Sequence, residues 1–67
     1  MGFRFTFDPI GDAVHMRITE TAIFESEEVQ PGLILDFDAD GKIVGMEFLN
    51  AGERFSTEAI KQFSEAA

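Results

Sequence analysis

The clearest chemical pattern in the sequence is a run of carboxylates, Asp36-x-Asp38-x-Asp40-Gly41, followed by Glu47. It fits the formula of a calcium-binding loop, in which acidic side chains surround the ion and a glycine allows a sharp turn. Such loops are clamped by helices, but the flanking residues here are β-branched and aliphatic. The segment is therefore predicted to be a β-hairpin turn, and calcium binding is the less favoured alternative.

Negative charge is concentrated in the middle of the chain. The 67 residues include 13 acidic and 5 basic side chains, a formal net charge of −8, and residues 25–47 contribute −6 of it. This charge either keeps the protein soluble and protects a sheet edge, or steers it toward a basic protein partner. The candidate partner-binding residues are Glu25, Glu27, Glu28, Asp38 and Asp40. Nucleic acid is not expected as a partner, because phosphate binding needs clustered lysine and arginine.

Two arginines are predicted to oppose each other across the first hairpin. Arg4 faces Arg17, with His15 beside them, and like charges at opposed positions destabilise a sheet unless something compensates. One candidate for the compensating group is a carboxylate, Glu25 or Glu27, from the neighbouring strand or a partner subunit. The alternative is a small anion held by Arg4, His15 and Arg17.

Catalysis is not expected from this composition. The sequence has one histidine and no cysteine, and a nucleophile needs a base, an orienting group and a cleft that excludes water. The lack of cysteine also excludes disulfides and thiolate zinc sites. We therefore predict a protein that is not an enzyme and that uses no cofactor and no metal ion.

Strand periodicity covers most of the chain. Apolar and polar residues alternate with a period of two near residues 3–7, 13–19, 23–29, 33–38 and 42–49. The third segment is rich in glutamate, as an edge strand protected against aggregation would be. The period then changes, and Ser56 can cap a helix near residues 56–66. The predicted fold is α+β: a small antiparallel β-meander of four or five strands with one C-terminal α-helix packed on one face, in a single domain over residues 1–67.

The register of the second hairpin follows from its apolar residues. A two- or four-residue turn pairs Phe37 with Val44 and Leu35 with Met46, which keeps the apolar side chains on one face. A simple three-residue turn would place Leu35 opposite Gly45 and separate them. A three-residue turn is therefore not expected.

The first hairpin indicates where a second subunit would bind. Its register pairs Phe7 with Val14 and, on the same face, Phe5 with Met16. A helix about 10–12 Å wide covers about two strands spaced ~4.8 Å apart, so part of this face stays open, and an open apolar patch marks an interface. We predict a homodimer that packs through Phe3, Phe5, Phe7, Met16 and Ile18.

Three motifs in this order resemble the small, mostly bacterial family catalogued as domain of unknown function 2283. They are the run 7–18 with its Asp-Pro and Asp-Ala pairs, the acidic stretch ending in Val29-Gln30-Pro31-Gly32, and the strand Val44-Gly45-Met46-Glu47. The resemblance covers roughly residues 7–50, and His15 departs from it because an aromatic such as tyrosine is usual there. It implies a compact sheet domain with no established activity. Some members are similar to companions of a small toxin gene, which implies an antitoxin-like binding role.

Together these features predict the class of protein. No segment is apolar and long enough to span a membrane, and no apolar leader follows a basic start, so a soluble cytoplasmic protein with no membrane partner is expected. The leading interpretation is a small acidic, non-catalytic, homodimeric binding or assembly module. The alternatives are an antitoxin-like partner of a basic protein, and a sensor that binds a small cation through the carboxylates of residues 36–47 or an anion through Arg4, His15 and Arg17.

Overall fold

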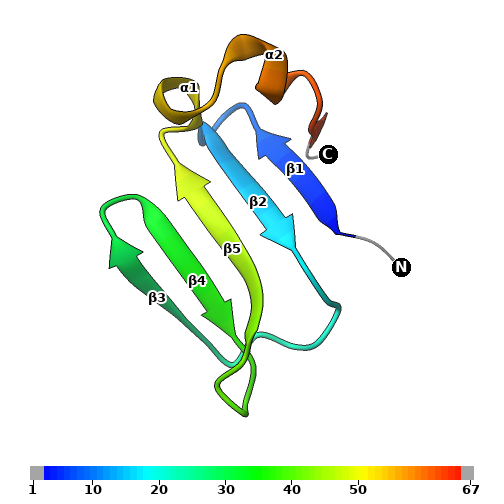
Figure 1. The fold of residues 1–67 in the computed structure, drawn as a ribbon, viewed down its shortest axis with the longest axis vertical. Helices are drawn as coiled ribbons and strands as arrows, with labels where there is room; N and C mark the ends of the chain where they lie inside the picture. Colours follow the sequence, from blue (N-terminus) through cyan, green and yellow to red (C-terminus); the bar gives the residue numbers. More distant parts are fainter. Residues whose placement is uncertain (1–2, 66–67) are drawn as a thin grey trace.

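The computed structural model describes residues 3–65 and consists of an open sheet with two short helices at one end (Figure 1). The elements in chain order are β1 (Arg4–Asp8), β2 (Ala13–Arg17), β3 (Glu25–Gln30), β4 (Leu33–Phe37), β5 (Ile43–Leu49), α1 (Ala51–Arg54), α2 (Thr57–Ile60) and β6 (Ser64–Glu65). The predicted α+β class and the antiparallel pairing of the first five strands are confirmed.

The strand order across the sheet is β3-β4-β5-β2-β1-β6. An antiparallel hairpin, β1–β2, and a three-stranded antiparallel meander, β3–β4–β5, lie side by side because β2 pairs with β5. In a sequential meander β2 would pair with β3, so the connectivity differs from the predicted one. Residues 18–24, the β2–β3 connection, instead lead the chain past the end of the sheet, and β3 lies at the sheet edge as its glutamates indicated.

The register of the first hairpin agrees with the prediction. Phe7 pairs with Val14, Phe5 with Met16, and Arg4 is opposite Arg17. The ladder begins at Arg4, so Phe3 and Ile18 lie just outside it. Because side chains alternate between the two sides of a strand, the phenylalanines of β1 share one side of the sheet and its arginine lies on the other.

The second hairpin contains a β-bulge that the sequence analysis did not anticipate. Leu35 pairs with Met46 as predicted, but Phe37 pairs with Ile43 instead of Val44. The register shifts by one residue between Asp36 and Phe37, and Val44 is the additional residue in β5. A bulge of this kind inserts one residue without moving the rest of the ladder to the other face.

The turn of this hairpin explains why the bulge is needed. The N–H of Asp38 donates to the carbonyl of Lys42 at 2.9 Å, which closes a turn of three residues, 39–41. Gly41 supplies the positive φ of 78° that a three-residue loop commonly requires. The expectation that three residues would be excluded is therefore wrong, because the bulge restores the apolar register beyond the turn.

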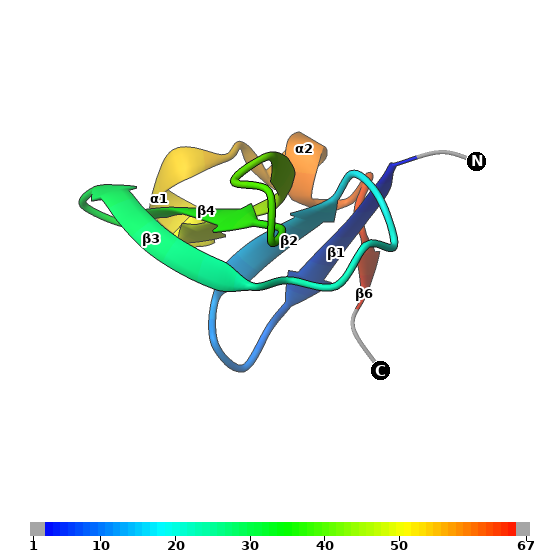
Figure 2. The same cartoon turned by 90° about the horizontal axis from the view of Figure 1, so that it is seen from below.

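The paired strands create two different sides of the sheet. The apolar face consists of two rows of residues: Phe5, Met16, Met46 and Leu35, and next to them Phe7, Val14, Phe48 and Leu33. The polar face on the other side also has two rows: Arg4, Arg17, Gly45, Asp36 and Ser26, and next to them Thr6, His15, Glu47, Ile34 and Glu28. Figure 2 shows that α1 and α2 lie on one side of the sheet only.

Aromatic contacts place the helical segment on the apolar face. The ring of Phe55 packs edge-on against Phe48 of β5 at 5.3 Å and against Phe63 at 5.4 Å between centroids. Phe63 in turn stacks on Phe5 of β1 at 5.8 Å. These rings cover one end of the apolar face. The buried apolar side chains in the described part of the chain are few and small: Ala13, Val14, Val44 and Ala51.

The single helix predicted near residues 56–66 is wrong. Its cap is confirmed, because the hydroxyl of Ser56 accepts a hydrogen bond from the N–H of Ala59 at 3.0 Å. However, the helix ends at Ile60, and Ser64–Glu65 then pair in parallel with β1; residues 66–67 lie outside the described part. A short helix of this kind is stabilised by packing rather than by its own hydrogen bonds.

The preceding helix α1 was not predicted from the sequence. It forms because Asp12 of the β1–β2 turn binds its first turn. The Asp12 carbonyl accepts from the N–H of Ala51 at 2.8 Å, and its carboxylate accepts from the N–H of Gly52 at 3.0 Å. Neither helix in the described residues has the length or apolar composition of a membrane-spanning segment.

Candidate functional site

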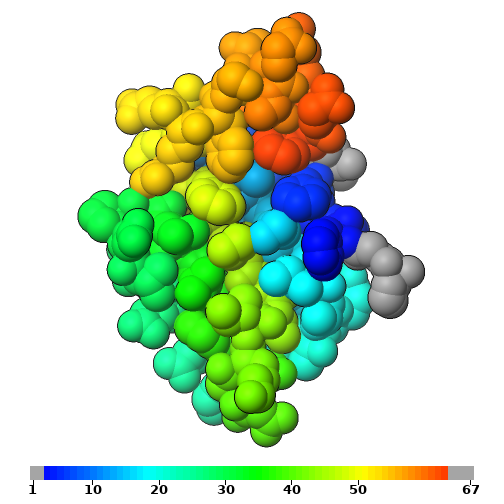
Figure 3. Space-filling view, in the orientation of Figure 1, coloured from blue at the N-terminus to red at the C-terminus, as the bar shows by residue number. Residues whose placement is uncertain are grey.

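The apolar face is open over most of its area. Figure 3, which looks onto the side carrying the helices, shows the C-terminal segment gathered at one end while β2, β4 and β5 remain visible below it. Phe5, Phe7 and Met16 lie on this face, and Phe3, with 63% of its surface exposed, packs edge-on against Phe5. Ile18 follows β2 and is half-buried. The structure thus groups the residues predicted for a dimer interface on one side.

The candidate acidic residues lie on the edge strand farthest from β1 and in the β4–β5 turn. All six residues of β3 are exposed. Glu25 and Glu27 pair with residues of the apolar face, and Glu28 lies on the polar face. Asp38 and Asp40 belong to the β4–β5 turn, which follows Phe37, the partner of Glu25. We call Glu25, Glu27 and Glu28 the acidic edge.

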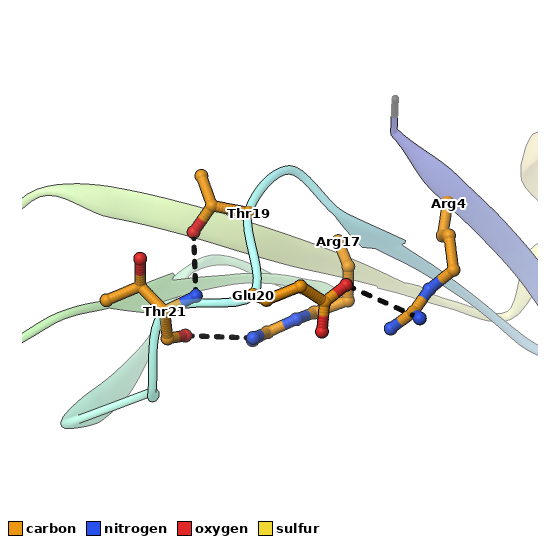
Figure 4. Close-up of polar contacts among 5 residues, drawn as sticks. All are labelled: Arg4, Arg17, Thr19, Glu20 and Thr21. Atoms are coloured by element: carbon orange, nitrogen blue, oxygen red, sulfur yellow. Dashed lines mark hydrogen bonds and ion pairs between the residues drawn. The ribbon is translucent and has the colours of Figure 1, made fainter. Parts of the chain in front are cut away.

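The two opposed arginines are compensated by the β2–β3 connection (Figure 4). Arg4 Nη1 lies 3.4 Å from Glu20 Oε2, and Arg17 Nη2 donates to the carbonyl of Thr21 at 2.8 Å. The hydroxyl of Thr19 accepts from the N–H of Thr21 at 3.0 Å and fixes this connection. The expectation that Glu25 or Glu27 of a neighbouring strand would compensate is wrong, because β3 lies at the far edge of the sheet. Compensation by a carboxylate of a partner subunit stays a prediction.

His15 lies on the same polar face but has a different partner. Its Nδ1 is 3.8 Å from Oε1 of Glu47, the residue opposite it on β5. The face therefore brings together Arg4, Arg17 and His15, but with Glu20 and Glu47 among them. A small anion at this position would compete with the Glu20 carboxylate for Arg4 and would be repelled by the Glu47 carboxylate beside His15. The arrangement therefore favours internal ion pairing over anion binding.

Asp36 is a buried carboxylate with a structural role that was not predicted from its place in the calcium-like pattern. Only 3% of its surface is exposed, and its Oδ1 accepts a 2.6 Å hydrogen bond from the hydroxyl of Ser26 on β3. Gly45, directly opposite on β5, makes room for it: a Cβ there would lie 3.1 Å from Asp36 Oδ2 and 3.0 Å from the Met16 carbonyl. Glycine inside a strand marks such a close approach and was the available signal.

The carboxylates of the calcium-like pattern are not brought together. Asp36 is bound to Ser26, whereas Oδ1 of Asp38 accepts from the N–H groups of Asp40 and Lys42, both at 2.9 Å. Glu47 lies opposite Ile34 of β4, away from the turn. Within residues 3–65 there is no group of three acidic or histidine side chains placed to hold a metal ion. In this chain the run of carboxylates contributes to a hairpin turn, which Asp38 stabilises.

Comparison with known proteins gives one match. The model of a family described as Protein of unknown function (DUF2283) matches residues 4–51, which contain β1 to β5. No curated protein and no solved structure matches the chain.

Proposed function

The chain belongs to the DUF2283 family of proteins of unknown function, and from this premise we propose that it is a non-catalytic module that binds protein and assembles as a homodimer through its apolar face. We place it in the cytoplasm, since its sequence contains no cysteine and needs no oxidising compartment. Its activity in this proposal is association, not chemistry.

One observation carries the proposal: the helical segment covers only one end of the apolar face. A sheet with one apolar side is stable when that side packs against a second layer. Here the rings of Phe55 and Phe63 supply that layer near β5 and β1, while Met16, Met46 and Leu35 remain half-buried. A second layer over this remaining part would complete the core.

A second copy of the chain is the occupant that fits this area. The molecule extends 35 × 29 Å in its two longer dimensions, so the outline of this whole side is about 1,000 Å², against the ~800 Å² that each partner buries in a standard interface. A two-fold interface joins the same patch on both subunits, and two apolar faces can pack with their sheets about 10 Å apart.

A basic protein is the second partner in this proposal. The carboxylates of Glu25, Glu27 and Glu28 lie on the edge strand, outside the apolar face or at its margin. Negative charge at this position steers a basic surface toward the edge and suppresses association with acidic proteins. This arrangement suits an antitoxin-like role, in which a small acidic protein binds a basic one; that role is an analogy with some family members.

Sedimentation equilibrium at tens of micromolar tests the homodimer. We expect a species of twice the 7.4 kDa chain mass. Met16→Glu, which places a charge between Phe5 and Met46, is expected to give the monomer, whereas the control Ile10→Ser, at a fully exposed turn position, is expected to remain dimeric. Circular dichroism establishes that each variant is folded. A folded wild-type protein sedimenting as a monomer would contradict the proposal.

A further inference from the structure

We propose that the free edge of β3 binds an extended basic segment of its partner as an added antiparallel β-strand. The inference deepens the proposed binding of a basic protein and rests on it. It assigns the mode of binding, which is main-chain pairing at a sheet edge, and it specifies a sequence pattern for the partner.

The backbone groups of β4 establish which way those of β3 point. The N–H of Leu49 donates to the carbonyl of Gly32 at 2.8 Å, and the N–H of Asp38 donates to the carbonyl of Lys42 at 2.9 Å. Gly32 and Asp38 lie just before and just after β4, and both direct these backbone groups toward β5. The even-numbered residues of β4 between them therefore do the same. Since the direction alternates along a strand, the odd-numbered residues of β4 direct theirs toward β3.

The same alternation leaves part of the β3 backbone facing outward. Glu25 and Glu27 pair with odd-numbered residues of β4, so their N–H and carbonyl groups are used within the sheet. Those of Ser26 and Glu28 point away from the sheet. These are the groups to which an added strand would bond, and β3 is exposed along its whole length.

The charges of β3 select the occupant. The ion pairs among residues 3–65 are Arg4–Glu20, His15–Glu47 and Lys61–Glu58, and none includes the acidic edge. Within the acidic edge, Glu28 Oε2 accepts a hydrogen bond from the N–H of Gly32 at 2.9 Å but keeps its charge unpaired. A second copy of β3 would bring glutamates opposite glutamates, which is destabilising across strands. A strand bearing lysine or arginine would neutralise them. The edge therefore fits a basic segment and not a copy of itself.

Exposed apolar side chains at both ends of β3 point independently to a partner. Phe24, just before the strand, has 69% of its surface exposed, and Val29 near its end has 42%. Charged side chains alone suffice to protect a sheet edge from aggregation. Exposed apolar side chains such as Phe24 and Val29 favour aggregation, so edge protection does not explain their presence. Both side chains would bury apolar surface on binding if a guest strand placed apolar residues beside them.

The geometry specifies the order of residues in the guest. In an antiparallel strand, the residues opposite Glu28, Glu27, Ser26 and Glu25 follow one another in that order. The expected pattern is therefore basic, basic, any residue, basic, with an apolar residue on each side to contact Val29 and Phe24. Guest residues opposite Ser26 and Glu28 direct their N–H groups toward β3, because those pairs are the hydrogen-bonded ones.

A synthetic peptide with the sequence Ser-Val-Lys-Arg-Thr-Lys-Phe-Ser is the probe for this pattern. Binding to the full chain is measured by fluorescence anisotropy at low salt and by amide chemical-shift changes along β3. N-methylation of the first lysine and the threonine removes the N–H groups that face β3, and we expect it to weaken binding at least about tenfold. N-methylation of the arginine and the second lysine, whose N–H groups face away, is the matched control and should weaken binding less than about threefold.

A charge variant of the protein tests the acidic edge itself. The triple variant Glu25→Gln, Glu27→Gln and Glu28→Gln is expected to weaken binding of the unmodified peptide about tenfold, because exposed pairs each contribute modestly. The control variant Glu53→Gln with Glu58→Gln changes exposed acids at the helical end of the molecule and should leave binding within about twofold.

Two outcomes would overturn the inference. Equal weakening by both pairs of N-methyl groups would show electrostatic attraction without strand pairing. No binding of the unmodified peptide at low salt would show that the glutamates only protect the edge. Sedimentation of the same samples separates this inference from the homodimer: a dimer that does not bind the peptide refutes strand addition alone, and a monomer that binds it refutes the homodimer alone.

Discussion

The guanidinium of Arg54 lies directly against the Cα of Gly32, in the space that any side chain at position 32 would occupy. From there Nε of Arg54 donates to the carbonyl of Leu49 at 2.7 Å and Nη2 donates to the carbonyl of Pro31 at 2.6 Å. Helix α1 is thus bound to the β3–β4 turn through the carbonyl of Pro31 and to the end of β5 through that of Leu49. Gly32, with a φ of 80°, is what allows the approach.

Gly32→Ala is expected to destabilise the protein by about 2–3 kcal/mol. About 1 kcal/mol comes from the left-handed conformation, and the rest from displacing Arg54 and its hydrogen bonds. Gly41→Ala is the matched control, because Gly41 has a similar φ of 78° and nothing within 4 Å of an added Cβ; it should cost only about 1 kcal/mol. Urea unfolding measures both, and equal losses would refute the role of Arg54.

The bond between Ser26 and Asp36 is expected to show a coupling free energy of about 1–2 kcal/mol. Asp36 is 3% exposed and accepts the hydroxyl hydrogen bond at 2.6 Å, so the bond is largely shielded from water. A double-mutant cycle with Ser26→Ala and Asp36→Asn measures the coupling by urea unfolding. Additive effects of the two substitutions would show that the bond contributes nothing to attaching β3.

Phe55→Ala is expected to lower the free energy of unfolding by about 2–4 kcal/mol. The ring contacts both Phe48 and Phe63 edge-on and so attaches the helical segment to the sheet. Ile10→Ala is the control: the side chain of Ile10 is 97% exposed in the β1–β2 turn, so its loss should cost below about 1 kcal/mol. A similar cost for both substitutions would contradict this assignment.

The ion pair of Arg4 and Glu20 is expected to contribute below about 0.5 kcal/mol. Both side chains are largely exposed and their charged atoms are 3.4 Å apart. A double-mutant cycle with Arg4→Met and Glu20→Gln, measured at low salt and again at 0.5 M salt, gives the coupling. A coupling above 1 kcal/mol that persists at high salt would mean that the pair is shielded from solvent.

Asp38→Ala is expected to destabilise the second hairpin by about 1 kcal/mol, because the Asp38 carboxylate accepts from two backbone N–H groups of the turn. Asp40→Ala is the control, since position 40 contributes its backbone N–H, which the substitution keeps. Thermal unfolding with and without millimolar calcium completes the test. Calcium should raise neither Tm; stabilisation of the wild type alone would revive the calcium-loop interpretation.

Local features predicted the hairpins but not how they join. The pairs Phe5–Met16 and Leu35–Met46 followed from alternation along the chain, and both occur. The pairing of β2 with β5 was missed because Met16 fits equally well against several alternating strands, and proximity in sequence favoured β3. The glutamates of β3 were the better signal, because a strand charged enough for an edge does not belong in the middle of a sheet.

The helical end could not be predicted from periodicity for a related reason. Ser56 was identified as a cap, but the end of α2 at Ile60 depends on Phe63 reaching Phe5 and on residues 64–65 pairing with β1. Helix α1 similarly depends on Asp12, which is some forty positions earlier in the chain. The residues next to α1 therefore give no signal that predicts it. At the candidate sites, the arginine pair was predicted, but its partner Glu20 lies on a connection whose path follows from the strand order.

The strand order also determines where other molecules can be attached to this protein. β1 and β6, the first and last strands, are neighbours at one margin of the sheet, and β3 occupies the opposite margin (Figure 1). A fluorescent protein or an immobilisation tag fused next to β1 or β6 would therefore be attached at the margin opposite β3. Surface-immobilised or fused versions of the chain can be used in interaction screens without shielding the strand that such screens would need to probe.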